Sequence, residues 1–509
     1  MRSLICRRHC QFFKPAADEP EKCLGYEFLA AWVRLEPGLA AALDQLPPGS
    51  APETEQLAQV SKLLCPRCVF RLHGCDYADP AGPADASPCG GLMALADLLS
   101  RGLIRLPEIK AAWERLLDGF YLRLAEHASL RLLEKPYLYD RLSDELYELN
   151  QEGFDWLARC DGTRSGLAAQ ADPEFLDFLL AESLVAVCTE PRPRPLHLRQ
   201  SPLPSLRYLE LMLTARCNLR CVHCYLGDQG HTDLPLASVL AALQELEAMQ
   251  GLRALLSGGE ALLYPHWEEL NARLRDFELR FILLSNGTLL DGDTLSRLQV
   301  HEIQISLDGL EAGHELIRGR GTWSRTVANL QAALARGLMV SVATMIHAGN
   351  QQELAELGQL LQEWGVREWG LDVPCFTGRL AQHPELYLDP AQAAPYLNLG
   401  FGGSDHGKVG DFACGIHHLA VLPTGQVAKC GLFAHRPVGH VQEGLETCWL
   451  RLPRLKLSEL ECAGCPYLTE CRGGCRFRAG EGLAPDPVMC ALYGIDPKKI
   501  KRLTDDQDL

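Results

Sequence analysis

The sequence predicts an α/β fold of parallel βα units for the middle of the chain. Between residues 205 and 375, short apolar runs typical of strands alternate with helical stretches. Small glycine-containing and polar motifs follow these runs in order, where the strand ends of a parallel sheet bind ligands. Six strands with intervening helices fit either an open doubly wound sheet or part of a β/α barrel.

Composition narrows the range of functions. The chain has 509 residues, so three or more domains are expected. Its net charge of −16 argues against nucleic-acid or anionic-membrane binding, which needs a basic surface. The N-terminus lacks an apolar signal region and no apolar run reaches membrane-spanning length. We therefore expect a cytoplasmic protein.

Cysteine usage is the most unusual feature of the composition. The chain carries 21 cysteines, with seven in residues 1–89, three in 217–224 and seven of the last eight in a spaced array at 414–490. In a reducing compartment such clusters indicate metal or redox chemistry and not a disulfide framework.

Five parts are expected along the chain. They are a cysteine-rich metal-binding segment (1–95), an α+β domain (96–192), a proline-rich linker (193–204), the βα part (205–395) and a cysteine-rich part with a tail (396–509). In the α+β domain, residues 96–118 are predicted to be helical, a β-meander follows, and helices are predicted at 151–159, 164–170 and 173–185.

The βα part has six predicted strands. They lie at 206–214, 254–259, 280–287, 302–309, 340–347 and 368–375. The helices between them are predicted at 235–249, 266–275, 291–298, 323–336 and 350–363. Beyond about residue 395 the periodicity fades into loops with cysteines.

Three cysteines follow the first strand, in the stretch "CNLRCVHCYLGD" of residues 217–228. Iron–sulfur clusters take cysteine thiolates, normally one per iron. Cys217, Cys221 and Cys224 on a four-iron cluster would leave one iron free to bind an amino and a carboxylate group. The alternative is a structural zinc site, for which His223 lies between two of the cysteines.

Four motifs, in a fixed order along the chain, resemble those of a known enzyme family. "CNLRCVHCY", "SGGE" (257–260), "SNGT" (285–288) and "SLDG" (306–309) follow successive strands. This set resembles the radical S-adenosylmethionine (SAM) enzymes over 206–380. The resemblance implies a partial (β/α)6 barrel, with a [4Fe–4S] cluster on Cys217, Cys221 and Cys224 that binds SAM.

The resemblance also implies roles for other positions. Gly258, Gly259 and Glu260 would line the methionine amino group, and Ser306 and Arg318 would hold the ribose and carboxylate region. The further candidates for SAM binding are His223, Asn286 and Asp308. The plain alternatives are an ordinary βα turn for the two glycines and a cap or turn for Asp308.

The C-terminal array resembles the SPASM domain of many radical SAM enzymes, which binds two auxiliary [4Fe–4S] clusters. The resemblance assigns Cys462, Cys465, Cys471 and Cys490 to a distal cluster, and Cys414, Cys430 and Cys475 to a near one. The near cluster then has an open iron or takes a ligand from Cys375, Cys448, His417 or His418. The alternatives are zinc ribbons, whose spacing fits poorly, and, for Cys375, a buried apolar role.

The N-terminal parts carry two further expectations. Residues 119–192 resemble the PqqD-like peptide-recognition element, a winged-helix-like fold that binds leader peptides; the alternative is an α+β spacer. Cys65, Cys68, Cys75 and Cys89 have metal-site spacing for iron–sulfur or zinc. Cys6, Cys10 and Cys23 either join that site or form a second one.

Together these features predict a radical SAM maturase of a ribosomally synthesised peptide. SAM would be cleaved reductively, and the 5′-deoxyadenosyl radical would oxidise or crosslink the peptide. The implied partners are a precursor peptide with a leader and an electron donor such as flavodoxin or ferredoxin. Asp372 is a candidate general base, with turn formation as the alternative, and Cys375 a candidate catalytic residue.

Three alternatives stay open. Maturation of a folded protein is disfavoured by Gly431, since sulfatase-activating enzymes carry aspartate there. A radical enzyme acting on a small molecule and a non-catalytic iron–sulfur electron carrier are the others.

Overall fold

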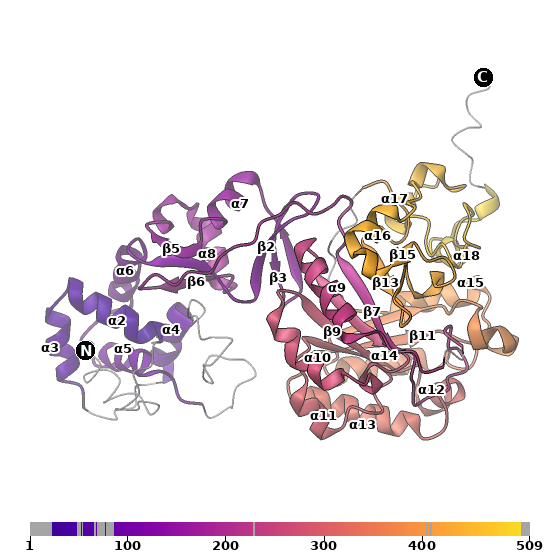
Figure 1. Ribbon diagram of the computed structural model, residues 1–509. Helices are drawn as coiled ribbons and strands as arrows, with labels where there is room; N and C mark the ends of the chain where they lie inside the picture. The colour runs from indigo at the N-terminus through magenta and orange to yellow at the C-terminus, as the bar shows by residue number, and fades with distance from the viewer. Residues whose placement is uncertain are drawn as a thin grey trace. The chain divides into compact units, whose positions relative to one another are not determined.

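The computed structural model describes residues 23–47, 52, 54–65, 68, 77, 86–227, 230–403, 406 and 410–499. The chain forms two compact units. The first comprises Met1–Leu130, Pro136–Asp140 and Tyr147–Leu198, and the second comprises Arg131–Lys135, Arg141–Leu146 and Arg199–Leu509. Figure 1 shows the order of the elements within each unit. No helix of the described ranges is long and apolar enough to cross a membrane.

The N-terminal part is more helical than expected. In the described part of the chain, five helices precede the first strand: α2 (Leu24–Leu35), α3 (Gly38–Asp44), α4 (Thr54–Leu64), α5 (Gly90–Ser100) and α6 (Leu106–Leu117). Helix α5 runs across the boundary expected at residue 95. The helical prediction over 96–118 is confirmed except around residues 101–105, where α5 and α6 are separated and Gly102 adopts a φ of 66°.

Two three-stranded sheets follow. One has the order β5-β1-β6, and the other β2-β3-β4. Their strands are β1 (Tyr121–Leu124), β2 (Ala128–Leu132), β3 (Pro136–Asp140), β4 (Glu145–Glu148), β5 (Asp161–Ser165) and β6 (Val185–Cys188), and the accompanying helices are α7 (Gln151–Leu157) and α8 (Pro173–Ala181). The β-meander expected here is confirmed as β2-β3-β4.

Two helix predictions need correction. The helix expected at 164–170 is wrong: β5 ends at Ser165, and only a 3-10 turn, Ala168–Gln170, follows. Helix α8 ends at Ala181, because Ser183 adopts a φ of 59°, and the apolar residues of β6 then form a fully buried strand.

The second unit is built on a nine-stranded sheet of order β12-β11-β10-β9-β8-β7-β13-β14-β15. The six predicted strands are confirmed as β7 (Tyr208–Thr214), β8 (Arg253–Gly258), β9 (Arg280–Ser285), β10 (Glu302–Ser306), β11 (Val340–Met345) and β12 (Glu368–Asp372). They are parallel and lie in sequence order. This order supports the partial barrel and not the doubly wound sheet, whose strand order reverses at a switch point.

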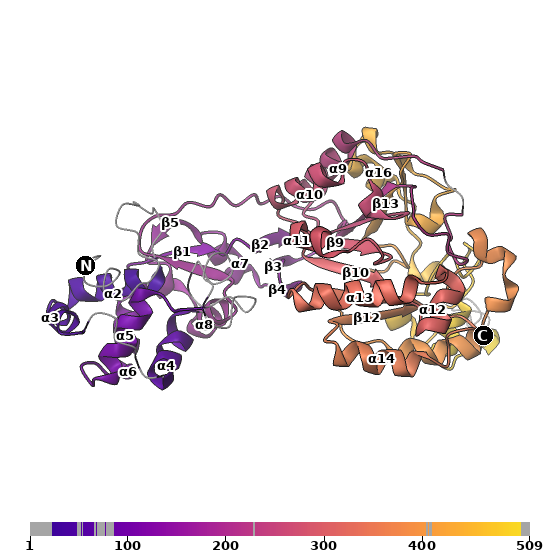
Figure 2. The same ribbon diagram turned by 90° about the horizontal axis from the view of Figure 1, so that it is seen from below.

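Helices connect the parallel strands and cover the outer face of the sheet (Figure 2). They are α9 (Leu236–Ala248), α10 (Trp267–Arg273), α11 (Gly292–Arg297), α12 (Glu311–Arg318), α13 (Thr322–Ala335) and α14 (Leu354–Glu363). The strands contribute buried aliphatic residues such as Leu211, Leu256 and Ile305 to one core. Strands β7, β9 and β11 are buried along most of their length, which explains their apolar character, whereas β12 is exposed or half-buried at four of its five positions.

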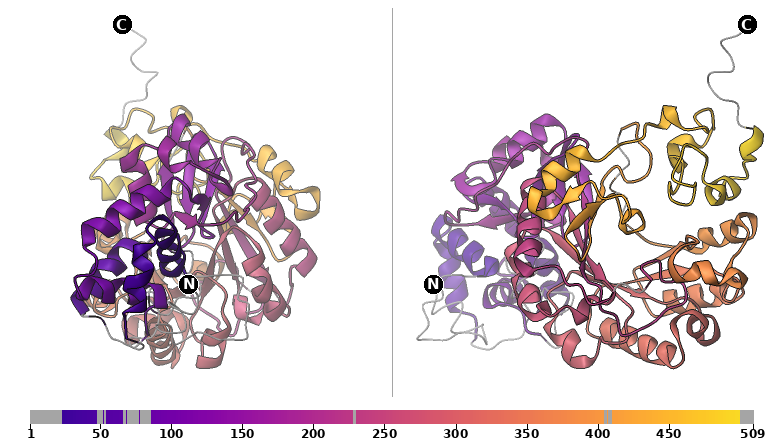
Figure 3. Two further views of the ribbon diagram at one scale, coloured as in Figure 1. Left: turned by 90° about the vertical axis from the view of Figure 1, so that its left-hand side faces the viewer. Right: turned by 45° about the vertical axis from the view of Figure 1, so that its right-hand side comes forward.

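Part of the cysteine-rich C-terminal region joins the same sheet. Strand β13 (His418–Val421) pairs in parallel with β7, and β14 (Gln426–Ala428) and β15 (Gly439–His440) follow as antiparallel strands. The expectation of loops beyond about residue 395 is therefore wrong for these residues. Strands of two to four residues are too short for periodicity to reveal. The right-hand view of Figure 3 shows the sheet as an open arc.

Short helices complete the second unit. They are α15 (Pro390–Ala393), α16 (Leu445–Arg451), α17 (Leu468–Cys471) and α18 (Pro487–Leu492).

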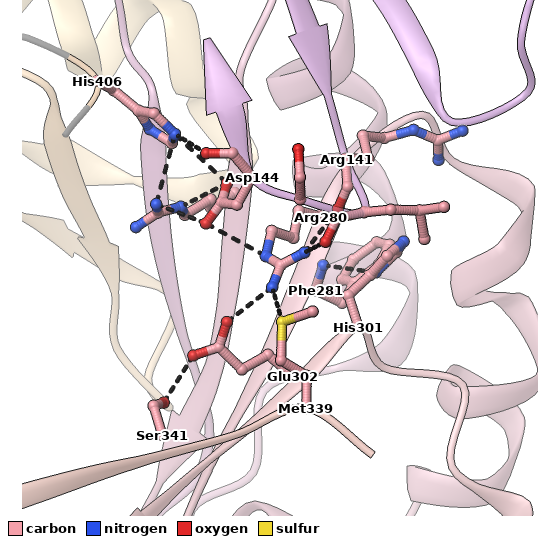
Figure 4. A network of polar contacts seen from close by, with 12 residues as sticks. Arg141, Asp144, Arg280, Phe281, His301, Glu302, Met339, Ser341 and His406 are labelled. Atoms are coloured by element: carbon pink, nitrogen blue, oxygen red, sulfur yellow. Dashed lines mark hydrogen bonds and ion pairs between the residues drawn. The ribbon is translucent and has the colours of Figure 1, made fainter. Parts of the chain in front are cut away.

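A buried charge network closes the amino-terminal end of the parallel strands (Figure 4). Arg280, which is fully buried, forms ion pairs with Asp144 at 3.3 Å and with Glu302 at 2.7 Å. Arg253 also pairs with Asp144, at 2.5 Å. Burial opposes ionisation of Asp144, but the His406 hydrogen bond and the two arginines outweigh it and lower the pKa of Asp144. The network thus ties the loop Arg141–Leu146 to the starts of β8, β9 and β10.

Candidate active site

The three cysteines of the central motif lie in the loop that follows β7, at the carboxyl end of the sheet. Cys217 is exposed, Cys224 is half-buried and Cys221 is buried. Burial, together with the nearby Glu260, Cys221 and Cys224, raises the pKa of Cys217 to about 11. The three cysteine thiols are therefore close enough for the charge of one to affect the ionisation of another.

The donor set fits an iron–sulfur cluster chemically. A four-iron cluster takes each thiolate on a separate iron, so cysteines spread along one loop are suitable ligands. Within the described residues, no three or more His, Cys, Asp or Glu side chains surround a single point as ligands of one ion would.

Two glycines at the end of β8 allow its backbone to lie directly against the start of the cysteine loop. A Cβ on Gly259 would lie 2.3 Å from the carbonyl oxygen of Arg216, and one on Gly258 would lie 2.4 Å from that of Thr214. The backbone N–H groups of Gly259 and Glu260 donate to the carbonyls of Thr214 and Arg216, both at 2.8 Å. The glycines therefore permit a backbone contact immediately before Cys217, which is more than an ordinary βα turn needs.

Glu260 is buried and joins the ends of two strands. Its carboxylate accepts hydrogen bonds from the Ser285 hydroxyl and the Asn286 N–H, both at 2.9 Å. Burial raises the pKa of this carboxyl despite those bonds. Its contacts fix the position of the loop after β9 relative to the Gly258–Gly259 turn.

An amide network then reaches the cysteine loop itself. The Asn286 side chain donates to Oδ1 of Asn218 at 2.9 Å and accepts from the Thr288 hydroxyl at 2.6 Å. Asn218 donates in turn to Thr288 at 2.7 Å. Asn286 therefore supports the loop between Cys217 and Cys221. Asn218 and Thr288 were not identified from the sequence, although both lie inside the quoted motifs.

Asp308 and Arg318 form a buried ion pair beside His223. Asp308 accepts from Arg318 Nε and from the Met345 N–H. Burial opposes ionisation of Asp308, but the charge of Arg318 outweighs it and lowers the pKa to about 2. Arg318 Nη2 lies 3.5 Å from His223 Nε2. Asp308 is thus neither a helix cap nor a simple turn residue.

Further contacts brace the cysteine loop from the other strand ends. Arg379, which follows β12, donates to the carbonyls of Cys221 and Gly227, both at 2.8 Å. The Val222 N–H donates to the Ile317 carbonyl of α12 at 2.8 Å. The contribution of Arg379 was missed because 158 residues separate it from Cys221.

The remaining predicted residues at the sheet mouth are less enclosed. Ser306 ends β10 and is half-buried. Asp372 ends β12, accepts from Arg478 at 2.6 Å and has a side chain that is 59% exposed. The ion pair with Arg478 connects β12 to the C-terminal cysteine segment.

All four cysteines predicted for the distal set line one cavity. Cys462, Cys465, Cys471 and Cys490 surround it, together with Tyr467 and Tyr493 among others. Burial, together with the other three cysteines, raises the pKa of Cys490 to about 11. The spacing in the sequence therefore corresponds to a real convergence in the structure.

The three cysteines predicted for the near set lie in two places, Cys414 beside Cys430 and Cys475 beside the candidate ligand Cys375. Cys414 is close enough to Cys430 to raise its pKa, to which burial contributes most. The thiols of Cys475 and Cys375 are hydrogen-bonded to each other. Among the proposed extra ligands Cys375 is thus the one in contact with a predicted ligand. Cys448, by contrast, is buried and donates to the carbonyl of His440.

The two histidines considered as extra ligands have other partners. His417 Nδ1 lies 2.8 Å from the Ser205 carbonyl, and His418 lies 3.7 Å from Glu210.

The N-terminal cysteines are partly described. Cys65, Cys68 and Cys89 are half-buried, as is Cys23. The predicted ligand Cys75, and also Cys6 and Cys10, lie outside the described residues.

Comparison with known proteins agrees with this geometry. Residues 211–363 match the model of the radical SAM superfamily. The chain carries a radical SAM domain. The matched residues include Cys217, Cys221 and Cys224, and also Gly258, Gly259, Glu260, Asn286, Ser306, Asp308 and Arg318.

Two curated relatives differ in how much of the chain they match. The mycofactocin maturase MftC of Mycobacterium ulcerans (strain Agy99) is 27% identical over 322 residues, 55% of this chain and 87% of the relative. The pre-heme d1 synthase of Dinoroseobacter shibae (strain DSM 16493 / NCIMB 14021 / DFL 12) is 30% identical over 177 residues, 33% of this chain and 43% of the relative.

A solved structure shares the fold. The crystal structure of Streptococcus suis SuiB bound to the precursor peptide SuiA aligns with a TM-score of 0.53 and 14% identity, covering 72% of this chain and 98% of SuiB. The likeness supports a mixed α/β radical SAM fold.

Proposed function

We propose that this protein is a radical SAM enzyme that cleaves SAM reductively and modifies a ribosomally synthesised precursor peptide. The observation that carries the proposal is the three-cysteine loop after β7, braced by the ends of β8, β9 and β12. The similarity to MftC continues well beyond the length matched by the pre-heme d1 synthase. This difference favours a peptide substrate over a small molecule.

The residues of the loop would hold the cofactors. Cys217, Cys221 and Cys224 would bind a [4Fe–4S] cluster, which with SAM supplies a carbon-centred radical for hydrogen abstraction. Gly258 and Gly259 leave backbone atoms free of side chains beside the loop. Arg318, fixed by Asp308, and His223 would orient SAM, with Ser306 contributing at the ribose.

The other predicted residues at this end of the sheet would mainly position the cysteine loop and the neighbouring strand ends. Glu260 and Asn286 hold the strand ends at fixed positions around the loop, which keeps reacting groups aligned. Asp372 is paired with Arg478, so as a general base it would have to exchange this partner for a substrate proton. The same contact lets Asp372 position the Cys475 segment.

The auxiliary clusters belong to the proposal as well. The cavity lined by Cys462, Cys465, Cys471 and Cys490 supports a distal [4Fe–4S] cluster. For the near cluster, with Cys414, Cys430 and Cys475, we favour Cys375 as the further ligand because its thiol contacts Cys475. A flavodoxin or ferredoxin would supply the electron. We propose a cytoplasmic location, where thiols stay reduced and available to bind clusters.

Leader recognition is proposed for the segment 119–192. Strands β4 and β5 each lie at the edge of a three-stranded sheet. Residues Thr163 to Ser165 of β5 are exposed. An exposed edge can accept an extended peptide as an added strand, as a PqqD-like element would.

Anaerobic reconstitution tests the proposal. With dithionite and SAM, the protein is expected to form 5′-deoxyadenosine, and Cys217→Ala is expected to abolish it, because one cluster ligand is lost. Cys160→Ala, which removes a buried cysteine outside all proposed sets, is the matched control. Equal 5′-deoxyadenosine formation by wild type and Cys217→Ala would refute the role of the loop.

The substrate is tested separately. Short precursor peptides encoded beside the gene are incubated with the reconstituted enzyme and analysed by mass spectrometry for a loss of hydrogen. If SAM is cleaved but none of the peptides changes or binds, the peptide assignment is wrong while the radical SAM assignment stands.

A further inference from the structure

Two cysteines of the first unit meet at the starts of two helices. Cys23 immediately precedes α2 and Cys89 immediately precedes α5, with nearly the same extended backbone, φ −63° and ψ 146° against φ −65° and ψ 153°. Their thiols are hydrogen-bonded to each other. Residues separated by 66 positions in the sequence are thus brought together as a thiol pair.

Glycines two residues after each cysteine make this contact possible. A Cβ on Gly91 would lie 2.1 Å from Gly25 C and from Tyr26 N. A Cβ on Gly25 would lie 3.0 Å from Cys89 Sγ. Any side chain at Gly91 would force the helix starts apart, so the Cys-x-Gly pattern of both segments places the sulfur atoms side by side.

Backbone donors surround the pair. The N–H groups of Tyr26 and Gly91 donate to the sulfur of Cys23, and the N–H of Leu92 donates to that of Cys89. Helix starts favour the thiolate, which is the form that binds metals.

A second pair of cysteines lies nearby. Cys65 directly follows α4, which packs against α5, and the Cys68 N–H donates to the Cys65 carbonyl at 3.1 Å. This tight Cys-x2-Cys turn is the arrangement that presents two thiolates to one ion. Cys68 is also close enough to Cys89 to raise its pKa.

We propose that Cys23, Cys65, Cys68 and Cys89 form a tetrathiolate site for a single Zn²⁺ ion. Four thiolates are a common ligand set of structural zinc, and the backbone donors around Cys23 and Cys89 supply the outer hydrogen bonds such sites use. In this assignment Cys23 replaces Cys75 of the sequence-based set. The ion would join the ends of α2, α4 and α5.

Metal binding and the packing of these helices would be coupled. In the described part of the first unit, no three potential ligands surround one point. The four thiolates would therefore come within bonding distance of one point only when the ion is bound, and the ion would then cross-link the starts of α2 and α5 with the end of α4.

Alkylation mapped by mass spectrometry tests the site in the full chain. Zn²⁺-loaded and chelator-treated protein are treated with a thiol reagent, and each cysteine is quantified in its own peptide. We expect Cys23, Cys65, Cys68 and Cys89 to be protected together by Zn²⁺ and to lose protection together with the chelator. Cysteines of the other sets are read separately, so metal bound there does not confuse the result.

Two variants sharpen the test. Cys23→Ser is expected to remove zinc protection from the other three cysteines, whereas Cys75→Ser is expected to leave it intact. The reverse pattern would overturn the proposal, as would zinc-independent alkylation of Cys23 and Cys89 in the wild type. Iron with acid-labile sulfide on these four cysteines would also overturn it. The wild-type measurement decides the matter even if a variant does not fold.

Discussion

The Asp308–Arg318 pair shows how one residue at the sheet mouth depends on another. Asp308 is fully buried, and the side chain of Arg318 is 10% exposed. A buried charge that loses its partner is strongly destabilising, whereas loss of both charges costs much less. The pair therefore fixes α12 to the end of β10. Removing one of its two charges is expected to destabilise the fold more than the same change in a surface pair.

Arg318→Met tests this dependence. We expect a loss of roughly 3–5 kcal/mol in the free energy of unfolding, because Asp308 is left as an unpaired buried carboxylate. The double variant Asp308→Asn/Arg318→Met should lose less. Urea unfolding followed by circular dichroism measures both.

The neighbouring Arg320 provides the matched control for this pair. Arg320 is exposed, and Arg320→Met should change stability by no more than about 0.5 kcal/mol. A similar loss for both arginine variants, or no relief in the double variant, would contradict the buried-pair explanation.

For single residues, the sequence predicted which residues lie at the site better than it predicted which residues they contact. The cysteines and Gly258, Gly259, Glu260, Asn286, Asp308 and Arg318 were selected from their motifs, and the structure places them around one loop. Their predicted roles toward SAM stay predictions. The contact of Arg379 with Cys221 could not be predicted, because it depends on the meeting of β7 with β12 across the sheet.

Among the elements, the turn after β8 makes a close backbone contact with the residues just before the cysteine loop. Gly259→Ala should push this turn away from Arg216, since the new Cβ would meet a carbonyl oxygen at 2.3 Å. We expect a cost of about 1–3 kcal/mol in stability and weaker SAM binding. Iron content after reconstitution and equilibrium dialysis with SAM measure the effect.

Gly370→Ala is the control within the same sheet. Gly370 lies in β12, and no atom lies within 4 Å of a Cβ built there. Its effect should stay within about 0.5 kcal/mol. If Gly370→Ala reduced SAM binding as much as Gly259→Ala, close backbone contact could not be the reason.

Element prediction succeeded where burial made a strong pattern. Strand β9, RFILLS, gives a nearly uninterrupted apolar run, whereas β10, EIQIS, alternates apolar and polar residues. The predicted helices between the strands follow a 3.6-residue period. The short strands β13 to β15 give no such run, because their pairing depends on the β7 edge and not on their own length. Helix α12 was missed for a related reason: its eight residues carry few apolar side chains.

Across the second unit, the buried charges of Figure 4 should make stability depend on pH. The pKa of Asp144 is lowered in the folded state, so its contribution is complete above the ordinary pKa of about 3.9 and is lost as pH falls below it. Asp144→Asn should cost about 3–5 kcal/mol near neutral pH, and this difference should shrink toward about pH 2. Urea unfolding at several pH values measures it.

The exposed Asp293 serves as the comparison for Asp144. Its side chain is 82% exposed and pairs with Arg297 on the surface, so Asp293→Asn should have an effect of at most about 0.5 kcal/mol at any pH. A pH-independent difference between wild type and Asp144→Asn would show that the carboxylate charge is not what stabilises the network.

The bracing of the cysteine loop bears on how the protein is maintained over time. Hydrogen bonds from Arg379, Asn218 and Val222 hold the loop through the polypeptide itself. Oxidative damage that removes iron and sulfide would then leave the cysteine loop in its folded conformation. Repair would amount to delivery of fresh inorganic parts by the cell's assembly machinery, with no need to discard the chain.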